Sequence, residues 1–182
     1  MESKAQNFFS EDCRVAVNYI ASYELHVSDA YLSMACYYNE EEAGVPHFAA
    51  FFEDQAEVKR EYAKQFLRYL RRHQGKICLP VIKRPDIDNW GTGIQAIESA
   101  LQLENTLNKL LQDLKALASE KSETDLIHFI GKFLDKQKRN IGYLEYQLNY
   151  QKELEKQDQQ EGQLQEPAEA SERCTPSVSL KL

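Results

Sequence analysis

The segment Gln74–Asp88 reads QGKICLPVIKRPDID and separates two stretches of helical apolar periodicity, 46–73 and 89–119. It contains Pro80 and Pro85, which oppose a continuous helix across it. Extended at about 3.3 Å per residue, the segment is long enough to cross the length of a helical bundle. The helices on either side of it are therefore predicted to run parallel, joined by one long crossover.

Apolar residues recur at alternating intervals of three and four positions in four parts of the chain, which is the period of an α-helix. These parts are 12–39, 46–73, 89–119 and 124–155. The connections at 40–45 and 120–123 are short, so each is expected to join two antiparallel neighbours. We predict an all-α fold, a four-helix bundle with one long crossover between helices two and three, over residues 1–155.

The ends of the fourth helix are predicted from two local features. Ser122 can cap its start, with Asp125 three residues later. The segment 156–182 is rich in Gln and Glu and has few apolar residues, so it cannot bury enough surface to fold on its own. We expect the helix to fray near residue 155 and 156–182 to form a disordered tail.

The charge and the cysteines limit the partners and the location. The 182-residue chain has a net charge of −7, which argues against nucleic acid or an anionic membrane as its main partner. No stretch approaches the roughly 18 apolar residues of a membrane span, and Met1–Cys13 lacks the apolar run of a signal peptide. The cysteines are widely spaced and are expected to be reduced thiols in a cytoplasmic protein. They are Cys13, Cys36, Cys78 and Cys174.

Polar residues interrupt the apolar stripe near the middle of each predicted helix. In the predicted topology these interruptions can meet at one height in the core. Facing helices that each present a polar ligand at mid-height are how di-iron carboxylate bundles are built. The residues are Glu24 and Tyr31 on the first helix, Lys59 and Tyr62 on the second, Glu104 on the third and Gln137 on the fourth.

Several of these stretches resemble ferritin subunits of the eukaryotic heavy- and light-chain type. YELHVSDAYLSMACYY (23–38) is similar to the first helix of that family. GKICLPVIKRPDIDNWGTGIQAIESALQLE (75–104), including Trp90, is similar to its crossover loop and third helix. HFIGKFLDKQKRNIGYLEY (128–146) resembles the fourth helix. The resemblance covers roughly residues 7–150 and implies the ferritin-like form of the bundle.

The resemblance also implies where a metal centre would lie. In ferritins that oxidise iron, the ferroxidase centre has a glutamate and a tyrosine on the first helix and a Glu-x-x-His pair on the second. A glutamate on the third helix and a glutamine on the fourth complete it. This chain keeps Glu24, Tyr31, Glu104 and Gln137, and has Lys59 and Tyr62 in place of the second-helix pair. The lysine resembles the replacement in ferritin light chains, which store iron without oxidising it.

A lysine at this position opposes metal binding. An ammonium about 4 Å from a ferrous ion, at an effective dielectric near 20, is repelled by about 8 kcal/mol. Tyr62 offers a phenol, a poor ligand while it is protonated. We expect Lys59 to lie between Glu24 and Glu104 and neutralise both, so that ferroxidase activity is lost. The alternative is residual metal binding by Glu24, Glu104 and Gln137.

Asp54, Glu57 and Glu61 share a second face of the second helix, at i, i+3 and i+7. By sequence alone, three acids on an exposed helical face are usually a solvated surface. In ferritin light chains, acids on this face point into the cavity and help nucleate ferric mineral. The resemblance therefore makes these residues candidates for mineral nucleation.

Two departures from the ferritin pattern concern the shell. Ferritin shells admit iron through a pore lined by acids near the start of the fourth helix, and the matching positions here are His128 and Gly131. Glu123 and Asp125 are the acids that remain nearby. Residues 158–182 show no convincing counterpart of the fifth helix, which we expect to be absent or degenerate.

The functional expectations follow from the resemblance. The first is a subunit of an intracellular iron-storage shell that binds ferric iron, with iron as the only cofactor implied and other ferritin subunits as homo- or hetero-oligomeric partners. The second is a structural or protective shell protein that has abandoned iron. A third is a slow residual ferroxidase.

Overall fold

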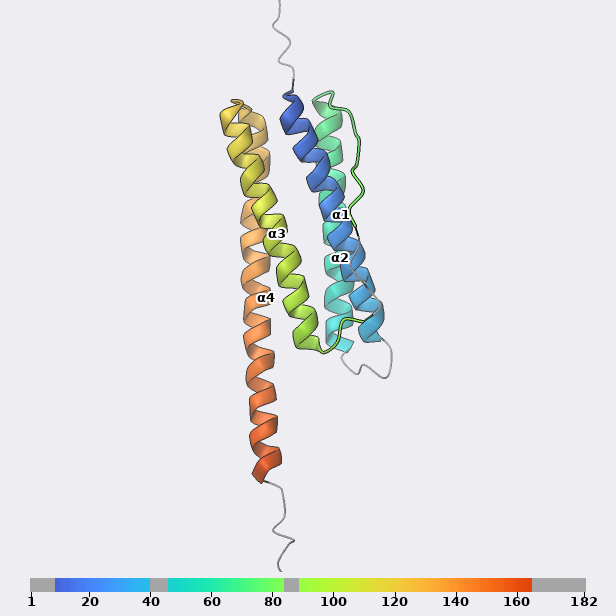
Figure 1. Ribbon diagram of the computed structural model, residues 1–182, viewed down its shortest axis with the longest axis vertical. Helices are drawn as coiled ribbons and strands as arrows, with labels where there is room; N and C mark the ends of the chain where they lie inside the picture. The colour runs from blue at the N-terminus through green and yellow to red at the C-terminus, as the bar shows by residue number, and fades with distance from the viewer. Residues whose placement is uncertain (1–8, 40–45, 84–88, 165–182) are drawn as a thin grey trace, which may run out of the picture.

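The computed structural model describes residues 9–39, 46–83 and 89–164 as an elongated bundle of helices (Figure 1). The helices are α1 Glu11–Asn39, α2 Pro46–Arg72, α3 Gly93–Glu120 and α4 Thr124–Leu164. Helix α2 runs back against α1, α3 runs in the same direction as α2, and α4 returns against α3. The closest packing is of α1 on α2, α3 on α4 and α1 on α3. The predicted all-α bundle with its long crossover is confirmed.

The crossover after α2 runs along α1 and is tied to it by polar side chains. The amide of Asn18 donates to the carbonyl of Lys76 at 3.0 Å and accepts the N–H of Cys78 at 2.7 Å. One turn further along α1, the Ser22 hydroxyl donates to the carbonyl of Pro80 at 2.9 Å. The backbone groups of an extended segment lack partners of their own, so these bonds hold it on the bundle.

Helix α3 begins at Gly93, four residues later than predicted, because a capping box fixes its start. The Thr92 hydroxyl accepts the Gln95 N–H at 3.3 Å, and the Gln95 side chain accepts the Thr92 N–H at 3.0 Å. Just before the cap, the buried Trp90 indole donates to the Ser33 hydroxyl at 3.0 Å. Residues 89–92 therefore belong to the crossover.

Ser122 ends α3 and does not cap α4. Its φ is 58°, in the left-handed region, directly after the last turn of α3. The N–H of Ser122 bonds to the carbonyl of Ser119 at 3.2 Å, and that of Glu123 bonds to Ala118 at 2.8 Å. This pair of bonds is a Schellman motif, in which glycine is the usual central residue. The predicted cap at Ser122 is therefore wrong.

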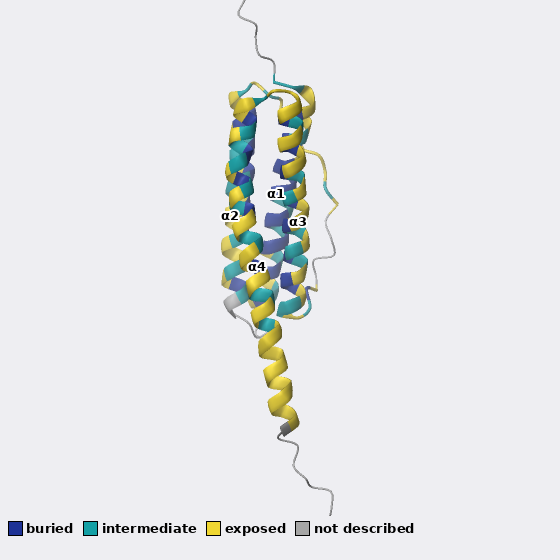
Figure 2. Cartoon of the chain, turned by 90° about the vertical axis from the view of Figure 1, so that its left-hand side faces the viewer, coloured by how far each residue is buried: buried dark blue, intermediate teal, exposed yellow. Residues whose placement is uncertain are grey.

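Helix α4 continues to Leu164, past the predicted end near 155. The side chains of 152–163 are exposed, and this part extends beyond the other helices (Figure 2). Gln, Glu, Lys and Leu have high helix propensity, which supports a helix without a buried face. The Lys156–Glu153 ion pair, at 2.8 Å, adds local support. The predicted tail and the fifth-helix positions from 165 onward lie outside the described residues.

The core places charge between aromatic side chains. On α2, the fully buried Lys59 lies between Phe52 and Phe66, which are also fully buried. Phe66 packs on Phe133 of α4 with ring centroids 4.5 Å apart. Phe52 packs on Tyr31 of α1 at 5.7 Å. Lys59 therefore lies in a part of the core that is flanked by aromatic rings.

Two smaller expectations are resolved by the described residues. No helix among them is long and apolar enough to cross a membrane. Cys13 is buried, Cys36 and Cys78 are exposed, and all three are unpaired thiols. Cys174 lies outside the described residues.

Candidate metal centre

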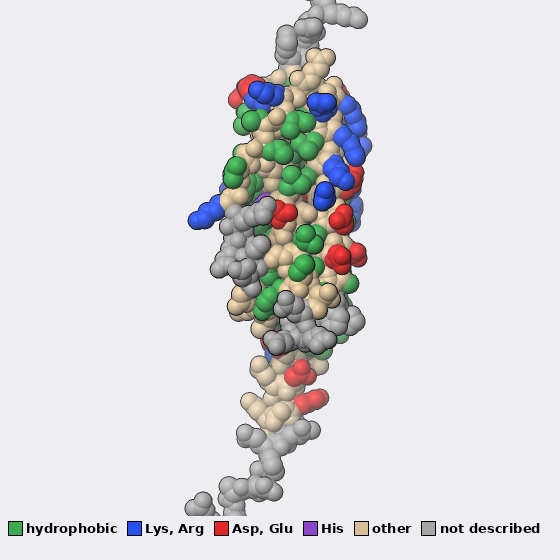
Figure 3. All heavy atoms as spheres, turned by 90° about the vertical axis from the view of Figure 1, so that its right-hand side faces the viewer, with side chains coloured by type: hydrophobic (Ala, Val, Ile, Leu, Met, Phe, Trp, Pro, Cys, Tyr) green, Lys and Arg blue, Asp and Glu red, His purple; other side chains and the backbone are tan. Residues whose placement is uncertain are grey.

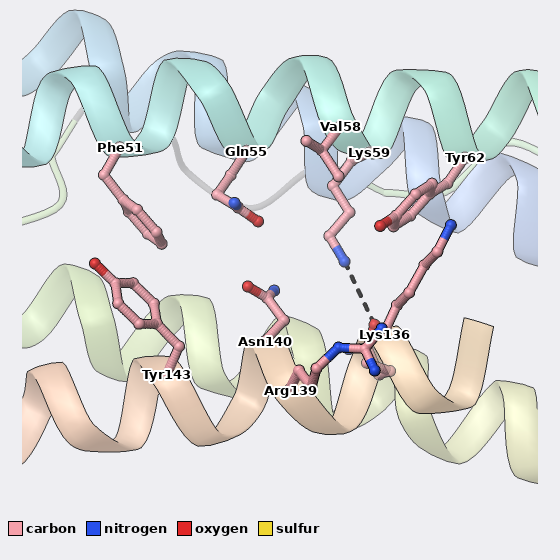
Figure 4. A pocket seen from close by; sticks show the side chains of 10 residues that line it. Phe51, Gln55, Val58, Lys59, Tyr62, Lys136, Arg139, Asn140 and Tyr143 are labelled. Carbon is pink, nitrogen blue, oxygen red and sulfur yellow. Dashed lines mark hydrogen bonds between the residues drawn. The ribbon is translucent and has the colours of Figure 1, made fainter. Parts of the chain in front are cut away.

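The polar residues expected at mid-height do meet in the core, and Lys59 is at their centre. Its ammonium reaches from α2 to Glu104 on α3, with 2.7 Å between Nζ and Oε2. The side chains are 1% and 0% exposed, so this ion pair is fully desolvated. The Lys59 ammonium also donates to the amide oxygen of Gln137 on α4 at 3.4 Å, drawn as a dashed line in Figure 4.

Glu104 accepts hydrogen bonds on both carboxylate oxygens. The Tyr31 hydroxyl donates to Oε1 at 2.5 Å, and Asn140 Nδ2 donates to the same oxygen at 2.8 Å. Gln137 Nε2 donates to Oε2, which also receives Lys59, and to the Glu104 backbone carbonyl at 2.7 Å. Donors from three other helices therefore surround this carboxylate.

Asn140 is a member of the centre that sequence reasoning missed. It lies three residues after Gln137 on α4, so both amides point to the same side of the helix. Its donation to Glu104 uses a lone pair that a metal ion would otherwise need. The signal that could have found it was the i, i+3 spacing of two amides facing the glutamate.

The protonation states follow from burial and neighbouring charge. Burial opposes the charge of Lys59, but the neighbouring Glu24 and Glu104 outweigh it and raise the pKa of Lys59. Burial and the adjoining Glu104 raise the pKa of Tyr31 well above its usual value. Lys59 therefore remains an ammonium at neutral pH, and Tyr31 remains a hydrogen-bond donor.

Glu24 is the exception in this network. It is 1% exposed, and its Oε2 has no hydrogen-bond partner among the described residues. Burial, reinforced by Glu104 and opposed by Lys59, raises the pKa of Glu24 to about 8. The described part of the chain has no Lys59–Glu24 ion pair. We expected Lys59 to lie between the two acids and neutralise both; its ammonium forms an ion pair with Glu104 and a hydrogen bond with Gln137, and acts on Glu24 through its charge alone.

Tyr62 forms a wall beside the centre. Its ring packs edge-on against Phe133, with centroids 5.3 Å apart, and Lys59 Nζ lies 5.7 Å from its centroid. Burial raises the pKa of Tyr62, so the phenol stays protonated and is a poor metal ligand.

Ferrous iron does not fit these residues. Within the described ranges, no group of three or more His, Cys, Asp or Glu side chains could hold a metal ion. The lone pairs of Glu104 are engaged by four donors, and a positive charge lies against it. Glu24 and Gln137 are also buried, and the Lys59 ammonium is bonded to two of the three candidate ligands, Glu104 and Gln137.

The sequence profile described as Ferritin-like domain matches residues 15–154. The chain belongs to the ferritin family. It is 38% identical to the middle ferritin subunit of Salmo salar over 130 residues, covering 71% of this chain and 74% of that protein. It is 35% identical to soma ferritin of Lymnaea stagnalis over 140 residues, covering 76% and 80%. The ferritin, lower subunit, of Aquarana catesbeiana is 33% identical over 130 residues, covering 71% and 75%.

The acidic face of this ferritin chain is partly neutralised. Asp54 and Glu57 are exposed on α2. Glu61 is paired with Arg68 at 2.9 Å and with Lys64 at 3.7 Å, and the hydrogen bond from Arg68 lowers the pKa of Glu61. Two of the three candidate nucleation residues are therefore exposed acids without a described ion pair, and the third shares its charge with two cations.

The positions that resemble the ferritin pore lie on the first turns of α4. His128 is exposed, and Gly131 is partly buried with space for a Cβ. The carboxylate of Glu123 accepts the Ser10 N–H at 2.9 Å, so this acid anchors the segment before α1. Asp125 remains exposed in the first turn.

Proposed function

We propose that this chain is an iron-storage ferritin subunit without a ferroxidase centre of its own. In this role it binds ferric iron inside a shell and depends on other subunits to oxidise ferrous iron. The observation that carries the proposal is the buried Lys59–Glu104 ion pair, which stands where the family resemblance expects metal ligands. Iron is the cargo of the shell and not a resident cofactor of this centre.

The electrostatics of the centre support the loss of oxidation. A ferrous ion at the Glu104 carboxylate would lie within about 4 Å of the Lys59 ammonium, which is worth about 8 kcal/mol of repulsion at an effective dielectric near 20. Deprotonation of Lys59 would remove this repulsion. The two acidic neighbours of Lys59 oppose it, because they raise the pKa of the ammonium. A slow residual ferroxidase built on Glu24, Glu104 and Gln137 would face the same repulsion.

The relatives and the surface support assembly with other subunits. The matched proteins are named as lower and middle subunits of ferritin and as soma ferritin. Figure 3 shows several clusters of hydrophobic side chains on one face of the molecule. Exposed apolar residues on α1 and the crossover include Val15, Leu32 and Val81, at 54%, 51% and 99%. Exposed apolar surface is typical of protein interfaces. We propose homo- or hetero-oligomers in the cytoplasm, without nucleic acid or membrane partners.

The second candidate is a structural or protective shell protein that no longer handles iron. Two observations favour it. Glu61 on the candidate nucleation face is paired with cations, and Glu123 near the pore positions is engaged with the backbone of Ser10. The cations beside Glu61 offset its negative charge, and the Ser10 N–H occupies one carboxylate oxygen of Glu123, so both acids are less available to iron.

Size-exclusion chromatography with iron analysis separates these functions. The chain is purified alone and after co-expression with a ferroxidase-competent ferritin subunit, and each sample is supplied with ferrous iron and oxygen. Storage predicts a large particle that oxidises iron slowly alone and retains ferric iron when mixed. A large particle of this chain that retains no ferric iron supports the structural role. A monomer or dimer contradicts both functions.

A pair of matched variants then tests the nucleation face. Asp54→Asn with Glu57→Gln removes the two exposed acids of that face, and retained iron per particle is expected to fall. Asp113→Asn with Glu120→Gln removes two exposed acids from α3 and is expected to leave it unchanged. Equal losses would contradict a role for the α2 face.

A further inference from the structure

A groove of about 590 Å³ lies between α2 and α4, beside the buried centre (Figure 4). It reaches the surface, and its lining includes three cationic side chains, Lys59, Lys136 and Arg139. No Asp or Glu side chain lines it in the described part of the chain. A groove lined by one sign of charge, in a chain whose net charge is −7, selects for a ligand of the opposite sign.

The two α4 cations are available to a ligand. Lys59 is already neutralised by Glu104. Lys136 and Arg139 lie three residues apart on one face of α4, and neither has an ion pair with a described acidic side chain. Lys136 Nζ lies 4.8 Å from the centroid of the Tyr62 ring, which holds the ammonium at the groove wall. An arginine and a lysine together bind the oxygens of a phosphate group well.

Neutral donors and aromatic rings complete the groove. The amide of Gln55 points from α2 toward α4, and the Tyr62 hydroxyl points along the groove toward Lys59 (Figure 4). At the other end, the rings of Phe51 and Tyr143 face each other across the two helices, with centroids 5.3 Å apart. Aromatic surfaces of this kind pack on planar rings. The groove therefore has a cationic part and an aromatic part.

We propose that the α2–α4 groove binds a small organic anion, a phosphate monoester that carries a planar ring. The phosphate lies against Lys136 and Arg139, and the ring lies toward Phe51 and Tyr143. The volume supports an organic ligand, because pockets for such ligands are about 300–1,000 Å³ and an inorganic phosphate would fill only a small part of the groove. The site is independent of iron storage, so failure of either proposal leaves the other standing.

Isothermal titration calorimetry on the iron-free, full-length protein tests the groove with three probes: phenyl phosphate, inorganic phosphate and phenol. Phenyl phosphate is expected to bind more tightly than either of the others, because it alone uses both parts of the groove. Equal affinity for phenyl phosphate and inorganic phosphate would overturn the aromatic part of the proposal. Absence of phenyl phosphate binding would overturn the whole.

Matched charge variants locate the binding. Lys136→Gln and Arg139→Gln are each expected to weaken phenyl phosphate binding by about tenfold, the value of a charged hydrogen bond. Lys138→Gln removes the same charge from an exposed position between them that does not line the groove, and is expected to change affinity by less than about twofold. Equal effects of the three variants would mean diffuse attraction and would overturn the site.

The aromatic contact has its own variant. Tyr143→Leu keeps an apolar side chain at a half-exposed position and removes the ring. It is expected to weaken phenyl phosphate while leaving inorganic phosphate unchanged. A thermal melt of each variant by circular dichroism checks that the bundle is intact. An unchanged affinity of folded Tyr143→Leu for phenyl phosphate would contradict the placement of the ring.

Discussion

Lys59 and Glu104 form an ion pair across the diagonal of the bundle, from α2 to α3, with 2.7 Å between Nζ and Oε2. These two helices are not among the closest packed pairs, which are α1 with α2, α3 with α4 and α1 with α3. The pair therefore links the two helical hairpins through the core. Buried pairs contribute uncertain net stability, but breaking one leaves a charge without compensation.

Removing the lysine is expected to destabilise the bundle strongly. Lys59→Met leaves Glu104 charged and buried, which typically costs about 3–5 kcal/mol, so the melting temperature falls. The matched control is Lys152→Met, which breaks the exposed ion pair with Glu98 and costs about 1 kcal/mol or less. Thermal melts at one protein concentration measure both. Equal losses would contradict a structural role for the buried pair.

Glu24 is expected to make stability depend on pH. Its carboxyl titrates near 4.5 when unfolded and near 8 in the bundle, so the folded state binds the additional proton between these values. The stability from this proton is complete below pH 4.5 and is lost as the pH rises to about 8. The slope is at most about 1.4 kcal/mol per pH unit.

Glu24→Gln tests that pH dependence because glutamine has the same shape and does not titrate. The free energy of unfolding of the variant, relative to the parent, is expected to increase as the pH rises from 4.5 to about 8. Chemical denaturation across this range measures it. The exposed Glu57→Gln is the control, and its difference from the parent should stay flat. A flat difference for Glu24→Gln would show that the carboxyl has a partner.

The fold could be predicted because its determinants are periodic or long. Helical apolar spacing placed the four helices, and the crossover with Pro80 determined that α2 and α3 run parallel. The errors lie at helix ends, because a few local hydrogen bonds determine where each helix begins or ends. The Thr92–Gln95 capping box delays α3, and Ser122 adopts a left-handed conformation that periodicity does not encode.

The residues of the site could be predicted from the sequence, but the hydrogen bonds and ion pairs among them could not. Register along each helix brings Glu24, Lys59 and Glu104 to one layer, and all three are buried. Which acid receives the ammonium depends on the direction of a flexible side chain in three dimensions. Asn140 was missed because its contact with Glu104 depends on how closely α4 packs on α3.

The left-handed residue at the end of α3 gives a stabilising substitution. Ser122→Gly removes the steric penalty of a side chain at φ 58° and is expected to stabilise the bundle by about 1 kcal/mol or less. Ser119→Gly makes the same change one turn earlier, within the helix, and is expected to destabilise by about 0.5–1 kcal/mol. Opposite shifts in melting temperature support the Schellman motif, and shifts of the same sign contradict it.

Introducing the second-helix ligand pair of the oxidising ferritins is expected to create iron oxidation. Lys59→Glu removes the repelling ammonium and adds a carboxylate beside Glu104, and Tyr62→His adds a neutral imidazole. The initial rate of ferrous oxidation by dioxygen should rise by about tenfold or more. Loss of a group that only hydrogen-bonds to a metal ligand lowers activity by about 10–100-fold, so gaining two ligands should have at least a comparable effect.

The control for this gain of activity is Lys59→Gln with Tyr62→His, which removes the positive charge without supplying the carboxylate. Its rate is expected to stay near that of the parent, because the neutral amide of glutamine does not supply the anionic carboxylate that helps Glu104 hold a ferrous ion. If the Lys59→Glu, Tyr62→His protein oxidises iron no faster than this control, Lys59 and Tyr62 do not occupy former ligand positions. The proposal that this ferritin lost its ferroxidase centre on α2 would then be wrong.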